Sequence, residues 1–412
     1  MARTPRVLFI HDNFPAQFGR FGQWLSGLGW EVSFATAAKD VSADGIRIFN
    51  YAPHREPAKE THPYAQPMEK AVINAQAFAR AALAERKEGY RPDLVVAHTG
   101  WGAGMFSKQI FPQARFIAYC EWWYRYPGSD VVYLAELNGE KPPSNVEGAI
   151  VEQSRNAPIA MDLSAASAAI CPTEFQARQF PPVFRSALSV MHDGIDTAYL
   201  CPDAEERRST LDGLVAEDAH VVTYATRGME PHRCFPQFVA ALPAVFEADP
   251  KAVAVIAGEN RVAYGSTRQR ETDWKEKALT DAGVDRSRVR FTGRLPYGEY
   301  RRLLRRSDAH VYLTVPFVLS WSMLESMSIG CAMVVSDTAP VTEYASEKNA
   351  RLVDLRKPGH LAERIIETLK DASGSASRRK AARDKIKAKL DMPDLYHAKA
   401  ELFAKVLKSV SG

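Results

Sequence analysis

Short, continuous apolar runs recur along the whole chain, and segments with helical periodicity separate them. Thirteen runs have the length of a strand, and we expect strands at 6–11, 31–36, 46–51, 93–98, 115–120, 168–173, 188–193, 220–226, 252–258, 289–293, 310–315, 332–337 and 350–354. Continuous apolar runs are typical of strands that are buried on both faces of a parallel sheet. Strands alternating with helices predict an α/β fold with doubly wound parallel sheets.

The polar positions predict where helices and loops lie between these strands. Apolar residues recur at helical spacing from 67 to 88, so this segment reads as a long amphipathic helix. We expect a last helix at about 395–410, after a Met-Pro-Asp turn, and a short loop at 373–377, where the sequence is SGSAS.

The strands fall into two series. After Pro202 the sequence turns polar, and a new series begins with the strand at 220–226, so the boundary lies near 195–218. A chain of 412 residues is long enough for two domains with separate cores. We predict an N-terminal Rossmann-like domain at 1–198 and a C-terminal one at 199–394, facing each other across a cleft.

Composition narrows the class of protein. A hydrophobic fraction of 46% and a charged fraction of 25% are ordinary for a soluble globular protein. The five cysteines are scattered and form no Cys-x-x-Cys pair, which argues against a disulfide framework or a zinc site and favours the reducing cytoplasm. The apolar run at 7–10 is too short for a signal peptide or a spanning helix, so we expect neither export by that route nor an integral membrane protein.

Net charge is +4, and the positive excess lies in residues 201–412. This excess is too small to indicate nucleic acid, but it suits an anionic diphosphate. Seven basic residues cluster at 378–389. They are either a solvated helix face or a surface that contacts anionic lipid.

The ends of the second series of strands carry residues suited to a nucleotide. In open parallel sheets, ligands bind beyond the carboxyl ends of the strands. Arg227 and Arg233 follow the strand at 220–226 and could hold a diphosphate, although two surface arginines at a turn are the simpler interpretation. A helix is expected to start near Ser322, so backbone N–H groups of Ser320, Trp321 and Ser322 could bind phosphate.

Glu325 lies inside that helix, where its carboxylate could accept hydrogen bonds from a ribose diol. The alternative is that it only complements the helix dipole. Gly258, Glu259 and Arg294 lie at further strand ends, and we expect them to contact the base and the sugar.

The first series offers a second set of strand-end groups. These are His11, Asn13 and Gln17 in the first loop, then His98 and Trp101 in AHTGWG, and Glu121 before two tryptophans and a tyrosine. A carboxylate beside aromatic rings suits sugar binding. Tight turns and core packing explain the glycines and the aromatic residues equally well.

The segment 288–343, with PFVLSWSMLES at its centre, resembles the donor-binding half of a family-4 (group 1) retaining glycosyltransferase of the two-Rossmann-domain GT-B architecture. Family members usually carry Glu, seven residues, Glu. Glu325 matches the second glutamate, and Phe317 stands at the position of the first, near the donor sugar. Arg233 stands where relatives carry lysine, and Glu121 where they commonly carry histidine.

The resemblance implies that Arg227 and Arg233 act catalytically by neutralising the leaving diphosphate, with Glu121 near the reacting sugar. It implies front-face attack by an acceptor hydroxyl, without a metal or any cofactor besides the donor substrate. The absence of an Asp-x-Asp triplet agrees. The first loop and the residues His98 and Trp101 then belong to the acceptor side, and the last helix packs back on the first domain.

We therefore expect transfer of a sugar from a UDP- or GDP-linked donor to a glycan, lipid-linked or other glycoconjugate acceptor, in bacterial surface polysaccharide assembly. The expected location is cytoplasmic, with peripheral contact at the inner face of the membrane. Two alternatives remain open: a nucleotide-sugar epimerase of similar fold, and a non-catalytic protein that binds a nucleotide or sugar.

Overall fold

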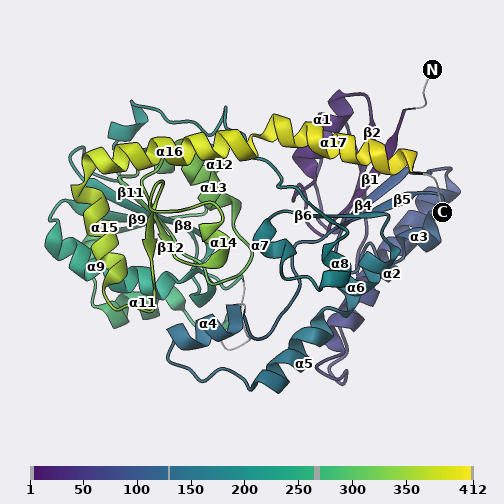
Figure 1. Ribbon diagram of the computed structural model, residues 1–412, viewed down its shortest axis with the longest axis horizontal. Helices are drawn as coiled ribbons and strands as arrows, with labels where there is room; N and C mark the ends of the chain where they lie inside the picture. Colours follow the sequence, from purple (N-terminus) through teal and green to yellow (C-terminus); the bar gives the residue numbers. More distant parts are fainter. Residues whose placement is uncertain (1–3, 129, 264–269, 410–412) are drawn as a thin grey trace. The chain divides into compact units, whose positions relative to one another are not determined.

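The computed structural model describes residues 4–128, 130–263 and 270–409 (Figure 1). The chain divides into two compact units. Unit 1 comprises the residues up to Pro127, Pro143–Gly194 and the residues from Pro393 on, and unit 2 comprises Gly128–Pro142 and Ile195–Met392.

Unit 1 is built on a seven-stranded sheet in the order β3-β2-β1-β4-β5-β6-β7, in which every pairing is parallel. The strands are β1 (Arg6–Ile10), β2 (Glu31–Thr36), β3 (Ile46–Asn50), β4 (Leu94–His98), β5 (Arg115–Tyr119), β6 (Ala168–Cys171) and β7 (Leu188–Val190). The helices are α1 (Gly19–Gly27), α2 (Gln66–Lys87), α3 (Ser107–Ile110), α5 (Asn145–Arg155), α6 (Ala157–Ala165), α7 (Glu174–Ala177), α8 (Pro182–Arg185) and α17 (Met392–Lys408).

Helix α17 packs on unit 1, although it is the last element of the chain. The ring of Phe403 lies 6.4 Å from that of Phe9 on β1 and 5.4 Å from that of Phe21 on α1. Lys399 Nζ donates to Asp193 Oδ1 over 2.9 Å, and both side chains are almost fully buried. Because removing one partner would leave a buried charge unpaired, this pair fixes where the helix docks.

Unit 2 is built on a six-stranded, fully parallel sheet in the order β10-β9-β8-β11-β12-β13. The strands are β8 (His220–Gly228), β9 (Ala252–Glu259), β10 (Val289–Gly293), β11 (Ala309–Tyr312), β12 (Met333–Ser336) and β13 (Arg351–Val353). The α-helices are α4 (Asp130–Leu137), α9 (Phe235–Ala248), α11 (Trp274–Ala282), α12 (Tyr297–Arg306), α13 (Trp321–Ile329), α14 (Ala339–Thr342), α15 (His360–Lys370) and α16 (Ala372–Leu390). Short 3-10 turns are η1 (Glu206–Arg208), η2 (Pro231–Arg233) and η3 (Arg286–Arg288).

The helices of unit 2 form two groups. Helices α11 and α15 both contact α9, and α12 and α16 both contact α13 (Figure 1). Helices on both faces explain why the strands carry continuous apolar runs. The predicted fold class, two doubly wound parallel-sheet α/β domains, is confirmed, and all thirteen predicted strands are present with ends that shift by a few residues.

Two local predictions were wrong. The segment 373–377 is helical, within α16, because Asp371 caps the helix by accepting from the Gly374 N–H and Ser375 is buried against Thr368. The Met-Pro-Asp segment opens α17 and is not a turn before it. Proline is compatible with the first turn of a helix, since no intrahelical partner exists there for an N–H.

The basic run at 378–389 is partly structural. Arg383 donates to the backbone oxygens of Thr197, Leu200 and Ser328, and Arg379 donates to that of Asp308. These side chains therefore attach α16 to unit 2, while Lys387 and Lys389 are exposed. No helix in the described part of the chain is long and apolar enough to cross a membrane.

Candidate functional site

Each sheet has a switch point, where chain progression reverses between two central strands. In unit 2 this point lies between β8 and β11, and in unit 1 between β1 and β4. Ligands of open α/β sheets bind at the carboxyl ends of the strands beside such points. The predicted residues gather at these two edges, which we call the β8–β11 edge and the β1–β4 edge.

The turn after β8 brings one predicted cation to the end of β11. Arg233 closes η2, and its guanidinium donates to Thr314 Oγ1 over 3.0 Å. The Arg233 backbone oxygen accepts from the hydroxyl of Tyr224, which is buried in β8. Arg233 is thus held at the switch point.

Arg227 lies near the end of β8, and its side chain is exposed. Glu230, which the sequence did not single out, is fully buried in the same turn, and its carboxylate accepts from the Ala263 N–H. This carboxylate attaches the turn to the segment after β9.

The N-terminus of α13 lies in the loop after β11. Ser320 caps the helix by accepting from the Ser322 N–H, and the Ser320 N–H donates to the hydroxyl of Tyr312. Helix α13 begins at Trp321, one residue earlier than predicted. Of the three predicted phosphate donors, the Trp321 N–H is the one without such a local acceptor, and the Ser320 and Ser322 hydroxyls lie 2.9 Å apart beside it.

Glu325 lies in the second turn of α13 and is half-buried. Its Oε1 accepts a hydrogen bond of 2.7 Å from the Tyr297 hydroxyl at the start of α12. The Tyr297 ring stacks on Tyr199 with centroids 5.6 Å apart, and Arg301 lies 4.2 Å above Tyr199. The aromatic support of Glu325 has no sequence signal, because Tyr199 belongs to a segment far from both helices.

Phe317, in the loop before α13, is 9% exposed. Its ring packs edge-on against His232 of η2, with centroids 5.8 Å apart. The Val315 N–H donates to the His232 backbone oxygen over 3.4 Å. The loop and the η2 turn therefore run side by side.

The remaining predicted residues of unit 2 lie at the ends of β9 and β10. Gly258 has a φ of 135°, and a Cβ there would lie 2.0 Å from the Thr226 backbone oxygen, so only glycine fits. Glu259 forms an ion pair of 3.0 Å with Arg261. Arg294 is exposed just after β10.

In unit 1 the β1–β4 edge brings three predicted rings together. The ring centroids of His11 and His98 lie 4.9 Å apart, and Trp101 lies 5.3 Å from His11 and 5.7 Å from His98. The Asn13 N–H donates to His11 Nδ1, so that nitrogen is unprotonated. Burial and the neighbouring His98 hold the pKa of His11 well below its usual value.

Glu121, just after β5, joins this edge. Its Oε1 accepts from Gln17 Nε2 over 3.0 Å, and its Oε2 lies 3.4 Å from His98 Nε2. His98 Nδ1 lies 2.9 Å from the Thr99 backbone oxygen and donates to it. Gln17 and Glu121 are therefore joined by a hydrogen bond, and the His98 ring lies beside Glu121. Groups of this kind can exchange hydrogen bonds with sugar hydroxyls.

Two further carboxylates lie at this edge: Asp12, which belongs to the first predicted loop, and Asp162, which the sequence did not single out. Asp12 accepts from the Tyr51 hydroxyl over 2.5 Å and from Asn74 over 3.2 Å. Asp162 is fully buried on α6, and burial raises its pKa to about 7, opposed by the Gly100 N–H and by His98. A single acidic residue on a helix gives no sequence signal for the burial of Asp162.

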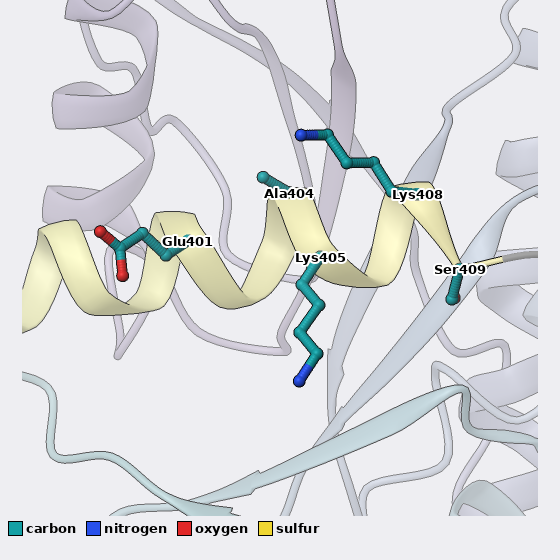
Figure 2. Close-up of a pocket in the computed structure, with 5 residues that line it drawn as sticks. All are labelled: Glu401, Ala404, Lys405, Lys408 and Ser409. Carbon is teal, nitrogen blue, oxygen red and sulfur yellow. The ribbon is translucent and has the colours of Figure 1, made fainter.

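Among the described residues, no group of three or more His, Cys, Asp or Glu side chains could hold a metal ion. A surface hollow lies along α17, lined by Glu401, Ala404, Lys405, Lys408 and Ser409 (Figure 2). It contains none of the predicted site residues, and its whole lining comes from α17 and the residue that follows it.

Comparisons with known proteins follow the same division of the chain. Residues 28–200 match the model described as Glycosyl transferase family 4 group, and residues 219–371 match Glycosyl transferases group 1. A comparison with curated protein sequences found no match.

Solved structures share the fold at low sequence identity. HepE of Anabaena, in complex with UDP and glucose, has 14% identity and a TM-score of 0.69, with 97% of this chain and 100% of that chain covered. Sucrose-phosphate synthase of Thermosynechococcus elongatus has 16% identity and a TM-score of 0.73, with 98% and 99% covered. A glycosyltransferase of Rickettsia africae has 11% identity and a TM-score of 0.70, with 99% and 100% covered.

These likenesses show the GT-B architecture, and the two matching family models together span more than three quarters of the sequence. The chain belongs to the glycosyltransferases that these two models describe. The family 4 model matches its first half, and the group 1 model matches its second half.

Proposed function

We propose that this protein transfers a sugar from a nucleoside diphosphate sugar to a hydroxyl of an acceptor, with retention of the anomeric configuration and without a metal ion. The observation that carries the proposal is the placement of Arg233 against Thr314 at the β8–β11 edge, beside the loop that leads into α13. A cation and a helix N-terminus at one switch point suit a diphosphate.

The donor is held by groups with separate tasks. Arg227 and Arg233 balance the charge of the diphosphate as it leaves, and the α13 N-terminus adds its partial positive charge. Glu325, oriented by Tyr297, accepts hydrogen bonds from the ribose diol. Gly258, Glu259 and Arg294 lie at the neighbouring strand ends and contact the base and the sugar. HepE, whose structure was solved with UDP and glucose, supports a UDP-linked donor.

The acceptor is bound by the β1–β4 edge of unit 1. His11, Gln17, His98, Trp101 and Glu121 offer rings and hydrogen-bonding groups to a sugar. We propose a glycan or a lipid-linked sugar as the acceptor, in bacterial surface polysaccharide assembly at the cytoplasmic side of the membrane. The exposed Lys387 and Lys389 on α16 are the residues that would contact anionic lipid.

Incubating the protein with UDP- and GDP-sugars, in the presence of a chelator, tests the proposal. We expect slow release of nucleoside diphosphate with one donor, and faster release when a glycan acceptor is added. Conversion of the donor into an epimer would contradict transfer, and so would tight donor binding without release under every acceptor tried. If a product forms, the proton coupling of its anomeric hydrogen reports whether configuration is retained.

A further inference from the structure

A helix from the first half of the chain is packed against the β8–β11 edge. Helix α4 lies more than fifty residues before Ile195, where the main segment of unit 2 begins. Its contacts nevertheless place it within unit 2, beside η2. Its Asp130 Oδ2 lies 2.9 Å from His232 Nε2, and Tyr133 lies 5.6 Å from the guanidinium of Arg356. Helix α4 is therefore fixed at two points.

His232 connects Asp130 to the donor edge. It directly precedes Arg233 in η2, and its ring packs against Phe317. The His232 ring therefore contacts both the Asp130 carboxylate and the apolar ring of Phe317, and its residue adjoins Arg233, the cation proposed to bind the diphosphate.

The burial of the pair argues against a purely structural role. The side chains of His232 and Asp130 are only 14% and 16% exposed. Two ionisable groups lose hydration at such a place, and an apolar pair of similar volume would hold a helix at least as well. The residual exposure leaves both within reach of a bound ligand.

The chemistry of this corner fits a sugar ring. Phe317 offers an apolar surface and no hydrogen bond, whereas the Asp130 carboxylate accepts hydrogen bonds and carries negative charge. Because both side chains contact His232, which adjoins Arg233, we infer that a group attached to a diphosphate at Arg233 lies close to them. A neutral, hydroxyl-rich sugar gains hydrogen bonds there, and a sugar acid is repelled by the carboxylate.

We propose that Asp130, supplied by α4 and oriented by His232, is the residue that selects a neutral sugar on the donor and rejects a sugar acid, with Phe317 as the apolar wall. This inference rests on the proposed function, because it assumes a nucleoside diphosphate sugar at the β8–β11 edge. Asp130 contacts the substrate, and His232 is a positioning residue.

Titration with UDP, UDP-glucose and UDP-glucuronate tests the inference without requiring turnover. For Asp130→Asn, we expect UDP affinity to stay unchanged and affinity for UDP-glucose to fall about 10- to 100-fold, since a hydrogen bond to a charged group is lost. Affinity for UDP-glucuronate should stay unchanged or rise. The ratio of UDP-glucose affinity to UDP-glucuronate affinity should therefore fall. His232→Asn should also lower the affinity for UDP-glucose, as Asp130→Asn does, and should leave the affinity for UDP unchanged.

The control is Glu140→Gln, which removes an exposed carboxylate just after α4 and should change none of the three affinities. An unchanged ratio of UDP-glucose to UDP-glucuronate affinity in Asp130→Asn would overturn the inference. Equal losses for UDP and both UDP-sugars would also overturn it, because they would mean that α4 only supports the turn. A wild-type protein that binds none of the three ligands refutes the proposed function itself, and with it this inference.

Discussion

The two switch points of this chain present different chemistry, although both sheets are parallel and doubly wound. At the β1–β4 edge, polar side chains contact one another: Gln17 donates to Glu121, whose other oxygen lies 3.4 Å from His98, and Tyr51 and Asn74 donate to Asp12. At the β8–β11 edge, two arginines and a helix N-terminus stand around the strand ends, and the Glu325 carboxylate is held by the Tyr297 hydroxyl.

This difference indicates how one fold serves two ligands. Cations beside a helix N-terminus suit an anion such as a diphosphate, whose binding depends on charge. Mutually hydrogen-bonded neutral and acidic groups suit hydroxyls, whose binding depends on geometry. The comparison predicts that substitutions at the two edges affect different steps.

The largest effect is expected at Arg233. Arg233→Ala removes a cation that stabilises the leaving diphosphate, so kcat should fall on the order of 100- to 1,000-fold. The measurement is the rate of nucleoside diphosphate release. Arg286→Ala, which removes an arginine from the opposite, amino-terminal side of the same sheet, is the control and should leave the rate unchanged. Equal rates for both variants would contradict the claim that a cation at the β8–β11 edge stabilises the leaving diphosphate.

A smaller effect is expected at Glu121. Glu121→Gln keeps the size of the side chain but replaces a charged acceptor, so kcat/KM for the acceptor should fall about tenfold. Because Glu121 belongs to unit 1, the affinity for UDP should stay at the wild-type value. Titration with UDP measures the donor-side affinity, and initial rates at varied acceptor concentration measure kcat/KM for the acceptor. A parallel loss of UDP affinity would show that the two edges do not divide the work in this way.

The smallest effect is a pH dependence of stability from Asp162. Burial raises the pKa of this carboxyl to about 7 from an ordinary value of 3.8. Between these values the unfolded chain releases the proton and the folded chain keeps it, so Asp162 lowers stability as pH rises from about 4 to about 7. Asp162→Asn cannot titrate, and its Tm relative to wild type should therefore increase over this range.

Melting curves of both proteins at several pH values check this prediction. A difference in Tm that stays constant from pH 4 to pH 7 would mean that the folded protein leaves this carboxyl with an ordinary pKa. Asp218→Asn provides the opposite case in unit 2, because the hydrogen bond and ion pair with Lys251 lower the pKa of the exposed Asp218 carboxyl. The Tm of this variant relative to wild type should not increase as pH rises from about 4 to about 7.

The strands could be predicted from sequence because the central ones are buried on both faces, so their runs are mostly apolar. The strand ends were less certain. For example, the run at 310–315 extends past β11, where the Thr314 N–H turns to the Ser336 hydroxyl and leaves the ladder. Helical residues at 373–377 were missed because a cap and a buried serine outweigh local propensity.

Only those residues of the site that lie near the ends of strands or the beginnings of helices could be predicted from the sequence. Arg227, Arg233 and Glu325 follow strands or open helices, and the sequence pattern therefore pointed to them. The side chains that support the site did not follow from the sequence pattern. Tyr297, which donates to Glu325, and Asp130, which pairs with His232 next to Arg233, lie in other elements. Such pairs depend on tertiary packing, and a single sequence carries no signal for them.

The central claim is that the β8–β11 edge binds a nucleoside diphosphate. Calorimetric titration of UDP and GDP into wild type, Glu325→Ala and Glu217→Ala tests it most directly, since Glu217 is an exposed carboxylate that precedes β8 at the far side of the sheet. The account predicts binding by the wild type and by Glu217→Ala, with affinity about tenfold or more weaker for Glu325→Ala. Equal affinity in all three proteins would contradict it.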